Sequence, residues 1–195
     1  MSHNPPHVST PWAPGRRPAP PPGRDRAAGP LLGASALCTG LMAGLFFAYD
    51  ISVMPGLAEM DDRAYAAAMQ RFNAVIDGSA LFGLVLLASL ASTVASAVLA
   101  FRRKWRAVAL PLIAAACCYT AVLVITVAIN LPLNAELAAL GDPATARDLP
   151  EVIDDFKSVW VPVNIVRTVL CVLSLGALCS ALVRYGRATA PLRRV

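Results

Sequence analysis

The residues of this chain best suited to chemistry are polar side chains that interrupt long apolar segments. Arg167 lies inside one such segment, with Trp160 and Asn164 at spacings that place all three on one face of a helix. An ionisable side chain at membrane depth is energetically costly, and it usually faces the protein interior or a cavity and marks a functional site. The sequence therefore predicts that Arg167 points inward and forms an ion pair with Asp77 or Asp50.

Other polar residues occur at matching ends of the remaining apolar segments. The first segment ends with Tyr49 and Asp50, the second begins with Asn73 and Asp77, and the third ends with Asn130 and Asn134. In an antiparallel bundle these ends all meet on the same side. We expect the side chains to line one pocket, with the alternative that the asparagines simply hold helices together and that an Arg–Asp pair is a packing device.

Pro132 stands between Asn130 and Asn134. Proline lacks a backbone N–H and displaces the preceding turn, so a carbonyl near Ala128 should lose its partner. Irregular backbone at membrane depth is tolerated only where protein or a water-lined cavity satisfies it. The two amides can satisfy this backbone or bind a ligand, and the sequence leaves both interpretations open.

The apolar segments identify the class of protein. Hydrophobic residues make up 57% of the 195 residues and charged residues 15%. Four segments have about the 20 residues needed to cross a bilayer. We predict an all-α protein, a four-transmembrane-helix bundle in residues 31–185, with spans at about 31–50, 74–101, 107–130 and 159–183.

The two loops next to the polar residues should also be helical. In the first loop, Asp61 or Asp62 can cap a helix with one apolar face; the face comprises Tyr65, Met69, Phe72 and Ile76. In the second, Asp148 is a candidate cap for a helix with its own apolar face; that face comprises Leu149, Val152, Ile153, Phe156 and Trp160. We expect both loops to fold over the end of the bundle as a lid.

The distribution of charge predicts the orientation. Most of the basic residues lie before the first span, between the second and third spans, and after the fourth, whereas the other two loops are acidic. The positive-inside rule then places both termini in the cytoplasm and the helical loops on the extracytoplasmic side. Because the basic residues cluster at span ends, the net charge of +5 does not favour nucleic acid as a partner. The composition favours a multi-pass protein of a bacterial plasma membrane.

The two ends of the chain differ from the bundle. Residues 1–30 are rich in Pro and Arg, a composition that cannot build a core, and we predict a disordered cytoplasmic tail. Residues 186–195 are predicted to form a short basic cytoplasmic tail. All five cysteines fall within spans, and both histidines, His3 and His7, fall in the first tail. The usual ligands for haem, non-haem iron or zinc are thus missing from the spans, and we predict no metal site.

Three short motifs carry a family resemblance: "FFAYDISVMPGLAEM", "NLPLN" and "WVPVNIVR". Their order and spacing, from about Gly40 to Arg167, resemble the anthrone oxygenase-like family of small four-span membrane proteins. Fungal polyketide-pathway members are linked to the oxidation of anthrones to anthraquinones without a metal or a flavin, whereas many bacterial relatives have no assigned activity. The resemblance implies the four-helix fold and a cofactor-independent oxygenase acting on a hydrophobic aromatic small molecule.

This chemistry assigns roles to the polar residues. An anthrone has an acidic methylene, so its oxidation needs a base, donors for the developing oxyanion and a flat apolar slot. The candidate base is Asp50 or Asp77, and Asp50 is favoured if Asp77 pairs with Arg167. The predicted catalytic residues are Asp50, Asp77 and Arg167, and the predicted substrate-binding residues are Tyr49, Asn73, Asn130, Asn134, Trp160 and Asn164, with Phe46 and Phe72 as further slot residues.

Two other functions remain open. The same polar cluster fits a non-catalytic membrane protein that binds a lipid or another hydrophobic ligand, or that supports a partner protein. A small transporter is less favoured, because the first three spans lack a charged residue near mid-membrane. The sequence does not indicate the oligomeric state, and membrane lipid is the one partner that every reading shares.

Overall fold

The computed structural model describes residue 25 and residues 27–190. The predicted tail at residues 1–30 lies mostly outside this range, and the last five residues of the predicted tail at 186–195 do so as well. Every regular element in the described range is a helix, which confirms the all-α prediction. The last helix continues to Thr189, four residues into the segment predicted as a tail.

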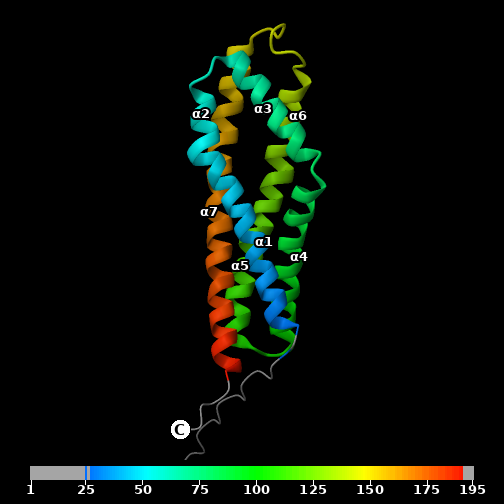
Figure 1. Ribbon diagram of the computed structural model, residues 1–195, viewed down its shortest axis with the longest axis vertical. Helices are drawn as coiled ribbons and strands as arrows, with labels where there is room; N and C mark the ends of the chain where they lie inside the picture. Colours follow the sequence, from blue (N-terminus) through cyan, green and yellow to red (C-terminus); the bar gives the residue numbers. More distant parts are fainter. Residues whose placement is uncertain (1–24, 26, 191–195) are drawn as a thin grey trace, which may run out of the picture.

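Four long helices form the body of the molecule (Figure 1). The first comprises α1 (Ala28–Ala48), the π-helical turn η1 (Tyr49–Val53) and α2 (Met54–Ala58), and the second is α4 (Ala80–Arg102). The third comprises α5 (Arg106–Ile125), the π-helical turn η2 (Thr126–Asn130) and α6 (Leu131–Ala139), and the fourth is α7 (Leu149–Thr189). All four are long and apolar enough to cross a membrane, as predicted.

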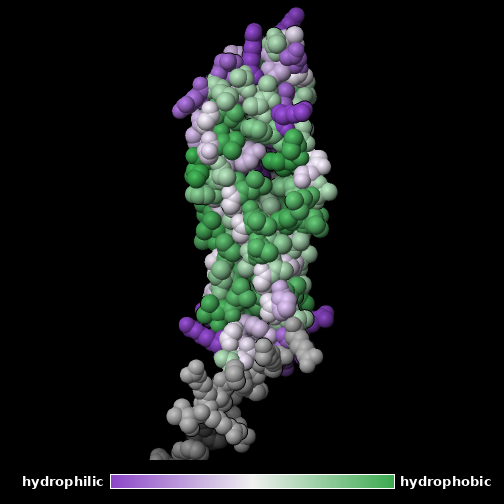
Figure 2. Space-filling view, viewed as in Figure 1, coloured by the Kyte–Doolittle hydropathy of each residue, from purple (hydrophilic) through white to green (hydrophobic). Residues whose placement is uncertain are grey.

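The four helices pack as a ring. Helices α1 and α5 each contact both α4 and α7, so each helix has two neighbours (Figure 1). Small residues allow close approach, and buried hydroxyls pair across the helices, as where Thr39 and Ser89 lie 2.6 Å apart. Exposed apolar side chains form a belt around the middle of the bundle, with hydrophilic residues at both ends (Figure 2). This is the surface expected of a protein that spans a membrane.

At one end of the bundle, α3 (Asp62–Asp77), α6 and the first three turns of α7 pack together; we call this part the headpiece. Asp61 caps α3, because its carboxylate accepts the backbone N–H groups of Arg63 and Ala64. Tyr65 and Met69 of α3 are fully buried, against a cluster that includes Leu137, Ile153, Phe156 and Trp160. Both predicted loop helices therefore form and cover the end of the bundle.

Two details of the loop prediction are wrong. Phe72, expected on the buried face of α3, is 40% exposed. It lies at the edge of the apolar face, where periodicity alone does not separate buried from exposed positions. Asp148 precedes α7 but does not cap it, because its backbone is left-handed, with φ of 55°, and its side chain accepts no bond from the helix.

Both π-helical turns precede a proline. In η1 the N–H of Met54 donates to the carbonyl of Tyr49, and Pro55 follows; in η2 the N–H of Leu131 donates to Thr126, and Pro132 follows. Each turn holds one residue more than an α-helical turn, which accommodates the donor that proline lacks. The disturbance expected before Pro132 is thus a π-helical turn, and the two turns bring Asp50 and Asn130 to the end of the bundle below the headpiece.

Candidate functional site

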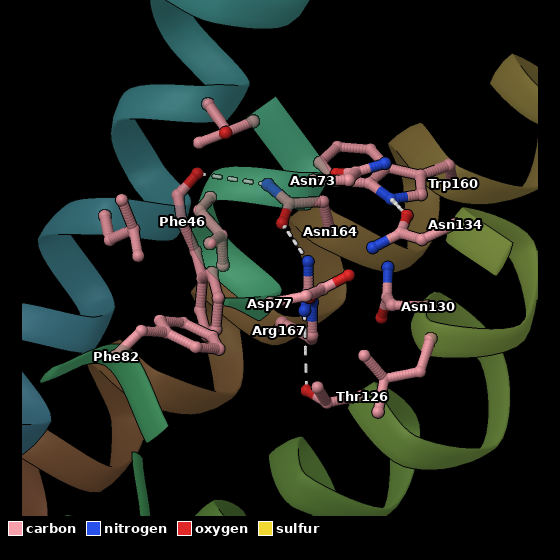
Figure 3. Close-up of a pocket in the computed structure, with 14 residues that line it drawn as sticks. Phe46, Asn73, Asp77, Phe82, Thr126, Asn130, Asn134, Trp160, Asn164 and Arg167 are labelled. Atoms are coloured by element: carbon pink, nitrogen blue, oxygen red, sulfur yellow. Dashed lines mark hydrogen bonds between the residues drawn. The ribbon is translucent and has the colours of Figure 1, made fainter. Parts of the chain in front are cut away.

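A pocket lies where the headpiece meets the bundle (Figure 3). Its cavity volume is about 40 Å³, within about 450 Å³ of empty space that includes open solvent. Helices α1, α3, α4, α6 and α7 and both π-helical turns contribute to its wall. The lining residues are Leu45, Phe46, Tyr49, Asn73, Ile76, Asp77, Phe82, Thr126, Asn130, Leu131, Asn134, Trp160, Asn164 and Arg167.

The pocket gathers most of the residues singled out in the sequence. All six predicted substrate-binding residues line it, as do Asp77 and Arg167, and the predicted slot residue Phe46 also lines it. Asp50 is close by but is not part of the wall, and the exposed Phe72 does not line the pocket either. Thr126 lines the pocket and was not singled out in the sequence, because a threonine in a helix commonly bonds to its own backbone, as it also does here to Val122.

Arg167 is almost fully buried, with 5% of its surface exposed. Its Nη2 donates to Oδ1 of Asn164 at 2.6 Å and its Nη1 to Oγ1 of Thr126 at 3.4 Å. Its guanidinium carbon lies 4.3 Å from the centre of the Phe46 ring and 5.7 Å from that of Trp160. Guanidinium groups stack well on aromatic faces, and Arg167 uses this contact in place of a direct ion pair.

The predicted ion pair of Arg167 with Asp77 or Asp50 is therefore wrong. Among the described residues, no carboxylate oxygen lies within 4.0 Å of the Arg167 guanidinium. Asp50 instead accepts bonds from two side chains of α7: Nδ2 of Asn164 at 2.5 Å, and the Thr168 hydroxyl. One amide thus separates the Asp50 carboxylate from Arg167.

Asp77, the last residue of α3, is the carboxylate that lines the pocket. No hydrogen bond or ion pair of its side chain occurs in the described part of the chain. Partial burial raises the pKa of Asp77 above its ordinary value. Asp50 was favoured as the base only if Asp77 formed an ion pair with Arg167. Because that pair does not form, Asp77 is the better candidate for the base.

Several polar atoms of the wall are buried without a partner within the described range. Both amide atoms of Asn130, Nδ2 of Asn73 and Nε of Arg167 belong to this group. A buried polar group without a hydrogen bond is destabilising, so such groups are rare unless they bind water or a ligand. Asn130 thus differs from Asn134, whose Oδ1 accepts a bond from the Trp160 indole at 3.1 Å.

The rest of the wall is apolar and partly aromatic. Trp160 lies 5.8 Å from the Tyr49 ring and stacks on Phe156 at 6.2 Å, with 22° between the planes. In Figure 3, Phe46 and Phe82 lie on the side of the pocket opposite Trp160. The site therefore combines aromatic faces with a carboxylate, a guanidinium and free amides. Within residues 27–190, no three His, Cys, Asp or Glu side chains lie together as a metal site would require.

Comparison with known proteins identifies the family of this chain. The family model described as anthrone oxygenase matches residues 72–177, which include seven of the nine predicted site residues, all but Tyr49 and Asp50. A search of curated proteins found no match, and a search of solved structures found none either. The match covers more than half of the chain, from the last turns of α3 into α7, and so includes most of the pocket wall. The chain belongs to the anthrone oxygenase family.

Proposed function

We propose that this protein is a cofactor-independent oxygenase of a flat aromatic substrate with an acidic methylene, of the anthrone type. One observation carries the proposal. The pocket holds a carboxylate of raised pKa, Asp77, together with buried donors that lack partners in the described range, on Asn73, Asn130 and Arg167. A base and free donors at one aromatic-lined cavity are the parts that enolate chemistry requires.

In the proposed reaction, Asp77 removes one proton from the substrate methylene. The negative charge that develops on the substrate oxygen is stabilised by Arg167 and the amides of Asn130 and Asn73. The carbanion then forms a C–O bond with dioxygen, which is reduced to the level of a peroxide. Protonation and loss of the remaining C–H proton cleave the O–O bond, leaving the substrate carbon as a carbonyl and releasing one molecule of water.

We further propose that the substrate reaches the pocket through the membrane. Leu131 belongs to the pocket wall and is 40% exposed. A hydrophobic aromatic molecule concentrates in a bilayer, so an entrance at an apolar rim would receive it without passage through water. In the orientation expected from the basic segments, this entrance is near the outer face of the plasma membrane, with both termini in the cytoplasm.

The test uses the purified full-length protein in detergent, with emodin anthrone under air. Quinone absorbance is followed against a sample without protein. The proposal predicts acceleration over that background and a loss of about 100-fold or more in Asp77→Asn, the usual contribution of a general base. Arg167→Ala should also be strongly impaired, because it removes the charged donor of the oxyanion site.

Two exposed residues provide matched controls: Asp154→Asn and Arg71→Ala should keep the wild-type rate. Thermal unfolding shows which variants remain folded. A wild-type rate equal to the background would overturn the proposal for this substrate and favour a binding protein for a lipid or another hydrophobic ligand. Acceleration that Asp77→Asn and Arg167→Ala both retain would place the chemistry outside the pocket.

A further inference from the structure

We infer that Asp50 is a positioning residue: through Asn164 it fixes the Arg167 guanidinium in the pocket, and it does not exchange a proton with the substrate. The inference deepens the proposed function and rests on it for the kinetic readouts. It concerns the chain Asp50–Asn164–Arg167, which connects η1 to the middle of α7.

The direction of every bond in this chain follows from the chemistry of its ends. An ionised carboxylate only accepts hydrogen bonds and a guanidinium only donates them. Asn164 must therefore turn its NH₂ group toward Asp50, at 2.5 Å, and its carbonyl oxygen toward Arg167, at 2.6 Å. The same NH₂ group donates to the backbone carbonyl of Phe46 at 3.0 Å, as Figure 3 shows. A rotation of the amide by half a turn would set donor against donor at Arg167.

Asp50 is itself held in place. Its second oxygen accepts the hydroxyl of Thr168, one turn beyond Asn164 on the same face of α7. Both carboxylate oxygens are thus bonded to α7, and the side chain is absent from the pocket wall. The π-helical turn η1 carries Asp50 and sets it beside α7. A group in this position can orient Asn164, but it has no path to a substrate proton in the pocket.

The amide between the two charges has a specific effect. A carboxylate in direct contact would occupy one or two N–H groups of Arg167 in a fork-shaped pair. Because Asn164 lies between them, Asp50 balances the charge of Arg167 without contacting it, and Asn164 occupies only one guanidinium nitrogen, Nη2. The buried Nε keeps no partner in the described part of the chain. Arg167 can therefore offer a donor to a ligand oxygen and still be held by Asn164, Thr126 and the Phe46 ring.

An exchange of the two side chains tests this arrangement. Asp50→Asn removes the obligate acceptor, so Asn164 is free to turn its NH₂ group toward Arg167. Asn164→Asp places two carboxylates side by side, which is unfavourable. The double variant Asp50→Asn/Asn164→Asp removes the contact of two carboxylates, because the new amide at position 50 donates to the new carboxylate at position 164, which accepts from Arg167. It does not restore the donor to the Phe46 carbonyl, and it places a carboxylate in direct contact with Arg167. Asp154→Asn, an exposed site on α7, is the matched control.

Four quantities are measured on the full-length protein in detergent: the pH profile and kcat for emodin anthrone, the Kd for emodin from quenching of tryptophan fluorescence, and Tm. For residues in direct contact, coupling typically corresponds to factors of about 2 to 150. We expect Asp50→Asn to lower kcat about 10-fold or more and to weaken emodin binding, while the acid limb of the pH profile stays where it is in the wild type. The double variant should have a higher kcat and bind emodin more tightly than Asn164→Asp, without reaching the wild-type values.

Two results would overturn the inference. If Asp50→Asn abolishes the acid limb, Asp50 is the base; if the double variant is no better than the worse single variant in kcat and Kd, the amide does not transmit its position. A wild-type protein without turnover would defeat the proposed function alone. In that case emodin affinity and Tm still decide the inference, because recovery of both in the double variant supports the chain and additive losses exclude it.

Discussion

The guanidinium carbon of Arg167 lies 4.3 Å from the centre of the Phe46 ring, and the backbone carbonyl of the same Phe46 accepts a bond from Asn164. One residue of α1 therefore supports both the charged group of the pocket and the amide that holds it. Stacking of this kind contributes about 0.5–2 kcal/mol, more when the contact is desolvated.

Phe46→Leu should consequently weaken the hold on Arg167. We expect a lower Tm and a loss of about 2- to 30-fold in emodin affinity or turnover, the range that corresponds to the stacking energy. Phe101→Leu is the control for the change from an aromatic ring to leucine, because Phe101 is 73% exposed and lies at the end of α4 that is far from the pocket. Combining Phe46→Leu with Arg167→Gln separates the loss of stacking on Arg167 from a general loss of packing. If the effects of the two substitutions on Tm and affinity simply add, the two residues are not coupled.

Asp77 should set the pH dependence of both activity and stability. Its pKa is raised in the folded protein, so as pH rises from about 4 the unfolded chain releases this proton first, and the folded state loses stability until its own pKa is passed. Asp77→Asn should therefore have a Tm above the wild type at neutral pH, and the difference should shrink in acid.

The same substitution should remove the acid limb of the pH–rate profile and lower turnover. Tm measured across pH and initial rates measured across pH are the two readouts. A Tm difference that is constant with pH would contradict a perturbed Asp77, and an unchanged acid limb would assign the base to another group.

Tyr65 presents a buried hydroxyl within the headpiece. Burial raises its pKa to about 12, and in the described range the hydroxyl has no hydrogen-bond partner. The ring packs edge-on against Phe156 at 6.5 Å, and the Lys157 ammonium lies 4.6 Å above it. We expect Tyr65→Phe to leave the free energy of unfolding unchanged or to raise it by up to about 1 kcal/mol.

Tyr65→Leu is the contrasting change, because it removes the ring and its contact with Lys157; it should lower the free energy of unfolding by about 1–3 kcal/mol. Denaturant or thermal unfolding in detergent measures both. A Tyr65→Phe variant that is as unstable as Tyr65→Leu would mean that the hydroxyl has a partner, such as an ordered water, that holds the headpiece in place.

Asn130 and Asn134 should respond in opposite ways to replacement by leucine. Asn130 is 2% exposed and neither of its amide atoms is bonded within the described residues, whereas Asn134 accepts the Trp160 indole. Asn130→Leu should leave Tm unchanged or raise it while weakening emodin binding; Asn134→Leu should lower Tm by leaving the indole N–H unpaired. If Asn130→Leu is the more destabilising change, its amide holds helices together and is not a ligand-binding group.

Much of this architecture could be predicted from the sequence because it follows from local patterns. Long apolar runs predict the four spans, and spacings of three and four residues predict α3. The polar groups share one end of each span, so an antiparallel bundle brings them together in a pocket whatever its packing details. Eight of the nine predicted site residues line the pocket for this reason.

The partners of these residues could not be predicted in the same way. Whether Arg167 meets a carboxylate or a ring depends on the rotation of α1 near its end, and η1 changes that rotation by turning Asp50 toward α7. Proline near each π-helical turn indicates a disturbance but not its form. Thr168, a partner of Asp50, could have been found from the sequence, because it lies one turn beyond Asn164 on the same face of α7.

Helix α7 has a consequence for the environment of the pocket. Its 41 residues form one continuous helix about 60 Å long, roughly twice the hydrocarbon thickness of a bilayer. The helix holds Trp160, Asn164 and Arg167 at fixed positions along its length. Their depth in the bilayer is therefore set by how far α7 extends beyond the membrane. A thicker bilayer would submerge the pocket rim in hydrocarbon and a thinner one would bring it among the headgroups. The chain length of the surrounding lipids would therefore change the polarity around the pocket without any change in the protein itself.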